Sequence, residues 1–230
     1  MSLKEKFIFN FIDDGRWHYI VDGLKVTLEV TFFAVLLGIA IVRSTYDKNK
    51  SSMRGFSKFI VVLLNFICKI YLTVIRGTPV VVQLMIMYFI VLVSSNNKVL
   101  VAVLAFGFNS AAYVAEIFRS GIMSIDEGQF EAGRSLGFNY VQTMRYIIIP
   151  QAFKNVLPAL ANEFIVLLKE TSVAGYVGLA DLTKGGDIIR SRTFQAFMPL
   201  IGVAVIYLVM VMFFTWLVGI LERRLRDSER

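Results

Sequence analysis

The sequence has very few of the residues on which metal sites, disulfide frameworks and hydrolytic centres depend. Cys68 is the only cysteine in 230 residues, so no disulfide can form within the chain. His18 is the only histidine, which leaves a histidine-based metal site or catalytic triad without support. Charged residues make up only 18% of the chain. We therefore expect no catalytic residue and no metal ligand in this chain.

Hydrophobic residues are correspondingly abundant. They make up 57% of the sequence, and the mean hydropathy is +0.67, which is too apolar for a soluble domain and typical of a polytopic membrane protein. The net charge is +7, but the basic residues are spread along the chain without a dense cluster that would follow a nucleic acid. A membrane surface explains the positive balance better. Asp13 and Asp14 interrupt the first apolar run, so no removable signal peptide is expected.

The apolar runs predict an all-α membrane protein with a single domain, residues 1–230, and five transmembrane helices. A crossing needs about 20 apolar residues. The predicted spans are 20–42, 59–93, 99–118, 151–176 and 194–221. Residues 3–19 are expected to lie along the membrane surface, and residues 176–193 to form an external loop. The basic loop 43–58 and the distribution of Lys and Arg place the C terminus in the cytoplasm.

The second predicted span is too long for one straight crossing, and Arg76-Gly77-Thr78-Pro79 interrupts it. Proline removes a backbone donor and disfavours helix in the residue before it. We therefore expect one bent helix with a half-helix beginning near Pro79. The free N–H groups of such a half-helix suit a carboxylate. Arg76 could hold the bent helix or a ligand.

Polar side chains inside the apolar runs are candidate ligand groups, because an ionisable residue in a span normally faces protein or water. Gln83, one turn after the break, could bind a ligand or have a structural role. Glu163, beside Asn162, could meet an ammonium group, or it could pair with a basic residue and hold helices together. Glu116 and Arg119 lie three residues apart and are expected to pair with each other.

The stretch EAGRSLGFNYVQTMRYIIIP, residues 131–150, is the longest polar run with a helical pattern. Gly133 and Gly137 stand four residues apart within it, and Pro150 ends it. Glycine inside a helix costs about 1 kcal/mol relative to alanine, so the pair needs a reason. We expect the glycines to leave a smooth surface that another protein can approach closely.

The spacing of this stretch resembles the EAA loop in the membrane subunits of bacterial ABC importers. The matching positions are Glu131, Ala132, Gly133, Gly137, Ile147 and Pro150. Gly133 stands where the family has a third small residue, and Ile149 stands where it has leucine. The resemblance implies that residues 127–150 form short cytoplasmic coupling helices that dock in a groove of an ATPase subunit.

Further stretches resemble the polar amino acid uptake branch of these importers, the histidine/glutamine/arginine permease type. They are Gly23-Leu24 with Thr27-Leu28, VIRGTPVVVQL (74–84), AYVAEIFRSGI (112–122) and LPALANEFIVLLKETS (157–172). The resemblance covers residues 20–220 and implies a type I ABC importer permease fold in the bacterial inner membrane. It also implies three kinds of protein partner: ABC ATPase subunits, a second permease copy or sister permease, and an external solute-binding protein.

The chain contains no G-x-x-x-x-G-K-[ST] phosphate loop. We therefore expect that it is not an enzyme, that it holds no cofactor, and that Mg-ATP binds to the partner ATPase. Its predicted function is to carry polar L-amino acids, such as basic amino acids or glutamine, across the membrane. The candidate substrate contacts are Gly77, Thr78, Pro79, Gln83, Asn162 and Glu163.

Three other functions fit the sequence less well. A proton- or sodium-driven secondary transporter favours titratable residues in matched positions of two repeats, and the sequence shows neither. A non-transporting membrane scaffold would explain the spans but not the EAA-like spacing. An intramembrane hydrolase would need a Ser/His or metal-ligand constellation. The particular amino acid stays open, although Glu163 favours a cationic one.

Overall fold

The computed structural model describes residues 2–42 and 56–227, and most of the predicted basic loop, residues 43–55, lies outside the described residues. The described part of the chain is helical and has no strand. In chain order its elements are α1 (Leu3–Phe7), the π-helix η1 (Ile8–Ile12), the 3₁₀-helix η2 (Asp13–Gly15), α2 (Trp17–Val42), α3 (Phe56–Gly77), α4 (Val80–Ile86), the π-helix η3 (Met87–Val91), α5 (Lys98–Met123), α6 (Glu127–Ser135), α7 (Tyr140–Thr143), the π-helix η4 (Met144–Ile148), α8 (Ile149–Glu170), the 3₁₀-helix η5 (Thr171–Val177), α9 (Leu182–Thr193) and α10 (Phe197–Asp227).

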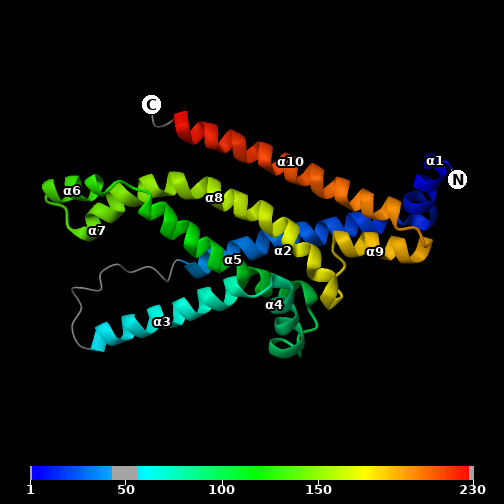
Figure 1. Ribbon diagram of the computed structural model, residues 1–230, viewed down its shortest axis with the longest axis horizontal. Helices are drawn as coiled ribbons and strands as arrows, with labels where there is room; N and C mark the ends of the chain where they lie inside the picture. The colour runs from blue at the N-terminus through cyan, green and yellow to red at the C-terminus, as the bar shows by residue number, and fades with distance from the viewer. Residues whose placement is uncertain (1, 43–55, 228–230) are drawn as a thin grey trace.

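The long helices α2, α3, α5, α8 and α10 run roughly along one axis (Figure 1). The short helices α6 and α7 lie at one end of this bundle, and the N terminus lies with α9 at the other end. The C-terminal end of α10 points toward the same end as α6 and α7. The two ends of the molecule are therefore built from different segments of the chain.

The N-terminal segment is a chain of short helices rather than one continuous surface helix. Ser2 and Glu5 form a capping box that starts α1. The buried Asn10 Nδ2 donates hydrogen bonds to Lys6 O at 2.8 Å and to Gln195 Oε1 at 2.9 Å. This segment is thereby attached to the turn that connects α9 with α10.

The predicted external loop, residues 176–193, contains a helix instead, α9. Its N-cap is the buried Asp181, whose carboxylate accepts hydrogen bonds from the backbone N–H groups of Thr183 and Lys184. Burial raises the pKa of the Asp181 carboxyl, and these backbone N–H groups oppose the rise. The glycines and charged residues of this segment do not by themselves predict a helix. The helix α9 is stabilised by packing against other helices, which the local sequence does not show.

Close packing holds α9 between α2 and α10. A Cβ atom on Gly185 would lie 2.2 Å from Tyr19 O of α2, and one on Gly186 would lie 2.4 Å from Val203 Cγ2 of α10. The small residues therefore allow three helices to approach one another. The buried apolar residues of this contact are Ile20, Leu182, Ile189 and Val203.

The break in the second predicted span lies where the proline places it. Helix α3 ends at Gly77, and α4 begins at Val80 after the extended Pro79. The axes of the two halves differ by 112°, so the second half does not continue along the first. A bend of this size is much larger than the kink of a single helix that crosses a membrane once. Among the described residues, α5 and most of α10 are long and apolar enough to span a membrane. If the two halves on either side of the break count as one span, there are three.

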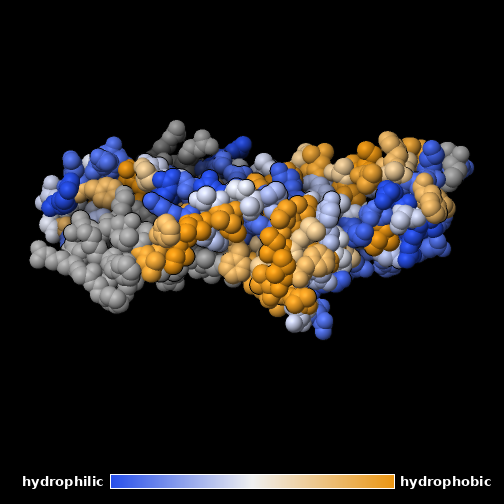
Figure 2. Space-filling model, turned by 60° about the horizontal axis from the view of Figure 1, so that its bottom comes forward, coloured by the Kyte–Doolittle hydropathy of each residue, from blue (hydrophilic) through white to orange (hydrophobic). Residues whose placement is uncertain are grey.

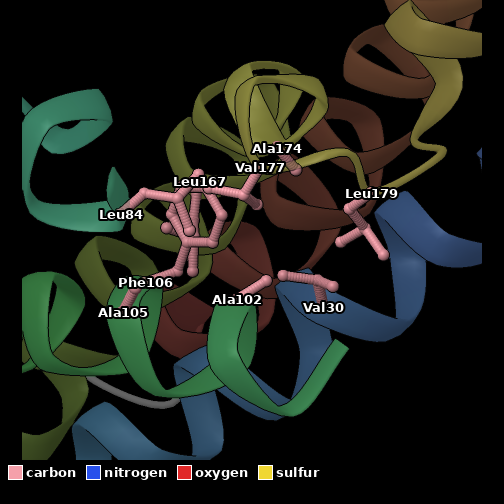
Figure 3. Packing of buried hydrophobic residues seen from close by; sticks show 9 residues of the cluster. All are labelled: Val30, Leu84, Ala102, Ala105, Phe106, Leu167, Ala174, Val177 and Leu179. Carbon is pink, nitrogen blue, oxygen red and sulfur yellow. The ribbon is translucent and has the colours of Figure 1, made fainter. Parts of the chain in front are cut away.

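The main apolar core lies around α5. Figure 3 shows Leu84 of α4, Phe106 of α5 and Leu167 of α8 close together, with Val30 of α2 and Ala174 of η5 in the same cluster. All of these side chains are almost fully buried. The core therefore joins the short helix after the break to the long helices of the bundle.

Large apolar side chains also cover parts of the surface. Figure 2 shows an apolar patch over the region of α4 and η3. Its exposed residues are Val82, Met85, Ile86, Phe89, Ile90, Val91 and Val93. A patch of this kind faces lipid or another chain in a membrane protein.

We predict that Gly185→Val destabilises the protein, because the added side chain would overlap the carbonyl of Tyr19. Overpacking of this kind costs about 1–3 kcal/mol. Thermal unfolding of the detergent-purified protein measures the effect. Gly219→Ala is the matched control, because a Cβ there meets nothing within 4 Å. Equal unfolding temperatures for the two variants would contradict the packing described for α9.

Candidate functional site

An open cavity of about 420 Å³ lies between α5 and α8. Its lining residues follow one another at steps of one, three or four residues, which places them on one face of each helix. Those of α5 are Tyr113, Glu116, Ile117, Ser120, Gly121 and Ser124, and those of α8 are Asn155, Ala159 and Glu163. Six of these nine residues carry polar groups, although most of the surface of the cavity wall is apolar.

Glu163 is the most deeply placed charged group of this cavity. Its residue is 9% exposed, and its Oε1 accepts a hydrogen bond of 3.0 Å from Ser110 Oγ of α5. In the described part of the chain no Lys or Arg side chain forms an ion pair with it. Burying a carboxylate is costly unless it is paired, so one hydroxyl is weak compensation. The ligand role of Glu163 stays a prediction.

Glu116 forms the second acidic group of the cavity. Arg119 Nε donates a hydrogen bond of 3.0 Å to Glu116 Oε2, which confirms the expected pairing of these residues. Arg76 Nη1, at the end of α3, lies 3.8 Å from the same Oε2. The Arg76 guanidinium also lies 5.8 Å from the ring centre of Tyr113. Arg76 thus brings the helix break to the edge of the cavity.

Gln83 has its whole amide engaged within the protein. Its Nε2 donates to Ile75 O at 2.7 Å, to Thr78 O at 3.0 Å and to Thr78 Oγ1 at 2.8 Å. Its Oε1 accepts a hydrogen bond of 3.0 Å from Asn109 Nδ2 of α5. The two carbonyls are among those that the break leaves without a helical partner. Of the two roles open to Gln83, the contacts favour the structural one.

The other predicted substrate residues lie in different surroundings. A Cβ on Gly77 would meet open space, and Pro79 is the extended N-cap of α4. Asn162 is exposed, and its Nδ2 donates to Pro158 O of its own helix at 3.2 Å. Neighbouring residues on a helix point about 100° apart, so Asn162 does not share the cavity with Glu163. Of the six predicted substrate residues, the structure places only Glu163 in the cavity lining. The other five, Gly77, Thr78, Pro79, Gln83 and Asn162, are not part of that lining.

Sequence reasoning missed several lining residues, among them Tyr113, Ser120, Ser124 and Asn155. Asn155 Nδ2 donates a hydrogen bond of 2.9 Å to Ser124 Oγ across the cavity. The signal that could have found them is periodic. Polar residues recur every three or four positions from Tyr113 to Ser124, and Asn155 stands two helical turns before Glu163.

The EAA-like stretch forms two short helices, α6 and α7, joined by a turn. Gly133 is buried, and a Cβ there would lie 2.6 Å from Thr143 Cγ2 of α7. This glycine serves an internal contact between the two helices, and not an outer surface as its sequence suggested. The exposed side chains of α6 include Glu131 and Ala132.

Gly137 ends α6. Its φ of +79° lies in the left-handed region that favours glycine. The N–H of Phe138 donates to Gly133 O at 3.0 Å, and the N–H of Gly137 donates to Arg134 O at 2.9 Å. This pair of bonds is a Schellman motif. Gly137 therefore does not lie inside one long helix. It ends the shorter helix α6.

The two-helix loop is tied to α8. Gln151 Nε2 of α8 donates to Gln129 Oε1 of α6 at 3.2 Å and to Ile147 O at 2.9 Å. Pro150 is the second residue of α8. The turn after α6 presents Leu136, which is 70% exposed. The loop is therefore anchored on one side and offers an apolar tip on the other.

The described part of the chain is a helical bundle with apolar outer faces, a sharply broken helix and a buried carboxylate that lines a cavity. These are features of a membrane transport component. Comparison with known proteins agrees. Residues 58–227 match the family described as "Binding-protein-dependent transport system inner membrane component". The chain belongs to this family. It is a transport subunit of the inner membrane and not an enzyme, and ATP hydrolysis takes place in a separate subunit.

Individual relatives cover almost the whole chain. The arginine transport system permease protein of Bacillus subtilis strain 168 is 37% identical and aligns with 92% of this chain and 94% of its own length. The glutamine transport system permease protein of Escherichia coli K12 is 34% identical, with coverages of 90% and 93%. These matches support the ABC importer prediction over a secondary transporter or a scaffold.

Solved structures share the fold. The crystal structure of an amino acid ABC transporter with histidines matches with a TM-score of 0.81, 40% identity and coverages of 97% and 99%. An inward-facing methionine ABC transporter matches with a TM-score of 0.72 at 20% identity, with coverages of 98% and 99%, and therefore shows similarity of fold alone.

We predict that Gln83→Leu lowers the thermal stability of the purified protein. The change leaves the buried Asn109 amide and the carbonyls at the break without their partner, and each such group costs about 1–3 kcal/mol. Asn162→Leu is the control, because this exposed amide bonds only to its own helix. A stability loss for Asn162→Leu as large as for Gln83→Leu would contradict the structural role of Gln83.

Proposed function

We propose that this chain forms part of an importer that carries polar L-amino acids delivered by an external solute-binding protein. The observation that carries the proposal is Glu163, a buried carboxylate with a single hydroxyl partner that lines the cavity between α5 and α8. The named substrates of the similar permeases, arginine and glutamine, support the same class. Members of the family work with an ABC ATPase and a binding protein.

Within the substrate site, Glu163 takes the role of the residue that meets the ammonium group or a cationic side chain. The break at Gly77, Thr78 and Pro79 takes the carboxylate end, and Arg76 supports this placement because it links the break to the cavity wall. Gln83 positions the break without touching the ligand. Asn162 has no part in the site. The chain itself holds no cofactor, and Mg-ATP binds to the partner ATPase.

The proposed topology has five crossings, formed by α2, α3, α5, α8 and α10. Helix α3 has 22 residues, which span about 33 Å, so it can cross without the half that follows the break. The C terminus and the loop 127–150 lie on the cytoplasmic side. The direction of α10, which runs toward the end of the bundle that holds α6 and α7, supports this (Figure 1). Arg223 and Arg224 near the end of α10 support it as well.

The proposed coupling device is the two-helix loop 127–150 docked on an ATPase subunit. Glu131 and Ala132 lie on the exposed side of α6. Gly133 and Gly137 set the shape of the loop, while Ile147 and Pro150 connect it to α8. ATP binding closes the ATPase subunits and draws the loops together, and the bond between Gln129 and Gln151 passes this movement to the helices.

A second permease subunit, either another copy or a sister chain, completes the pathway in this proposal. The apolar patch over α4 and η3 supports it, because such a face needs lipid or protein cover (Figure 2). Each subunit would contribute one loop to one ATPase subunit.

We predict that Ala132→Arg reduces recovery of the ATPase with the purified permease about tenfold or more, because the bulky cation blocks close approach of the partner. Co-purification measured by subunit stoichiometry tests this. Ala132→Ser, which keeps the side chain small, should retain the ATPase. Full ATPase recovery with Ala132→Arg would contradict docking through this surface of α6.

We predict that Glu163→Gln weakens apparent substrate affinity about tenfold or more, because a buried charge pair to the ligand is lost. The measurement is stimulation of ATP hydrolysis by the liganded binding protein, tested with each of the twenty amino acids. The panel also identifies the transported amino acid. Unchanged affinity for every amino acid would place the substrate site elsewhere.

A further inference from the structure

Phe194, in the turn between α9 and α10, is 93% exposed, the highest value among the large apolar side chains of the described residues. Its φ of +54° lies in the left-handed region, which a bulky side chain rarely adopts. Strained residues of this kind cluster at sites of function. Because the protein leaves the Phe194 side chain almost uncovered, its function points to a contact outside the chain.

The N-terminal segment lies against the same turn. Asn10 Nδ2 donates a hydrogen bond of 2.9 Å to Gln195 Oε1, and a Cβ on Gly202 of α10 would lie 2.7 Å from Phe11 Cζ. The large apolar side chains that this segment leaves exposed include Leu3, Phe7, Ile8 and Ile12. Two segments that are far apart in the sequence thus present apolar side chains at one end of the molecule, opposite α6 and α7 (Figure 1).

Helix α10 places these side chains relative to the bilayer. Residues Phe197–Leu225 are long and apolar enough to span a membrane, and the rest of the described chain buries few of them. The rise from Phe197 to Trp216, both exposed, is about 28 Å. The hydrocarbon core is about 30 Å thick, and tryptophan collects at its borders, so Trp216 at one border places Phe197 at the other. Gly202, where Phe11 packs, then lies about 8 Å inside that border.

We propose that an interfacial anchor of this chain inserts into the leaflet of the bilayer that lies opposite the two-helix loop. Its residues are Leu3, Phe7, Ile8, Ile12, Phe194 and Phe197. Lipid is its partner because this surface continues the exposed apolar face of α10. The depth agrees as well, because helices at a membrane interface bury their apolar side chains about 5–10 Å into the boundary between headgroups and acyl chains.

The anchor holds α9 at a fixed depth. Phe194 ends α9, Asn10 links the N-terminal segment to the same turn, and the Arg192 guanidinium of α9 lies 4.9 Å from the ring centre of Tyr19 in α2. Insertion of the Phe194 ring into lipid removes apolar surface from water, which offsets the cost of its left-handed backbone. The inference rests on the proposed crossing by α10, and neither the substrate nor the ATPase enters it.

Tryptophan fluorescence of the full chain in nanodiscs tests the anchor. Phe194→Trp and Phe7→Trp are each made in a chain whose only tryptophans, Trp17 and Trp216, are replaced by phenylalanine. The phospholipids carry bromine, a collisional quencher, either near the carbonyl end or near the methyl end of the acyl chain. Bromine near the carbonyl end should quench both probes about twofold more strongly, because an interfacial side chain stays within about 5–10 Å of the headgroups.

Two further chains serve as controls. Leu136→Trp, in the same background, places the probe at an exposed apolar position of the two-helix loop, and bromine at either depth should leave it unquenched. A chain that keeps Trp216 as its single tryptophan tests the crossing by α10, and brominated lipid should quench this tryptophan.

Three outcomes would overturn the inference. The first is quenching of Phe194→Trp no stronger than that of Leu136→Trp, and the second is stronger quenching by bromine near the methyl end. The third is quenching of Phe194→Trp by water-soluble iodide that the solute-binding protein prevents, which would make Phe194 a docking residue for that protein. If Trp216 is quenched while Phe194→Trp is not, α10 crosses the membrane and only the anchor fails.

Discussion

The carbonyl groups released where α3 breaks must find hydrogen-bond partners inside the protein, and Gln83 provides them. Its amide bonds to Ile75 O and Thr78 O, and Asn109 holds the amide from the opposite side. In an apolar surrounding an unsatisfied carbonyl is expensive, so a break at membrane depth requires such a partner. The sharp turn, the position of Arg76 and the separate course of α4 all depend on this contact.

One helix supports both sides of the site. Asn109 and Ser110 are consecutive residues of α5, and they hold Gln83 of α4 and Glu163 of α8 respectively. Further along the same helix Tyr113 and Glu116 form the cavity wall. The helix ends at Met123, and a short turn through Ser124 leads to α6. One helix thus connects the cavity wall with the loop proposed to meet the ATPase.

The EAA-like loop matches the spacing of the family, but its two glycines do not have the role that their positions in the sequence suggested. Gly133 and Gly137 suggest a smooth outer surface when they are placed on one helix. In the folded chain Gly133 makes room for Thr143, and Gly137 ends α6 in a left-handed conformation. The glycines therefore determine the shape of the loop, and the surface offered to a partner consists of other residues.

The sequence by itself determined the helical class, the approximate limits of the long helices, the break before α4 and the family, because apolar runs, proline and motif spacing act locally. It also named Glu163 as a candidate ligand group, and this role stays a prediction. Only the tertiary structure decided the 112° turn, the helix α9, the partner of Glu163 and the structural role of Gln83. Ser110 and Glu163 are 53 residues apart, and Asn109 and Gln83 are 26 apart. Such contacts depend on how helices pack side by side, and helical periodicity within one segment carries no information about the neighbour that it meets.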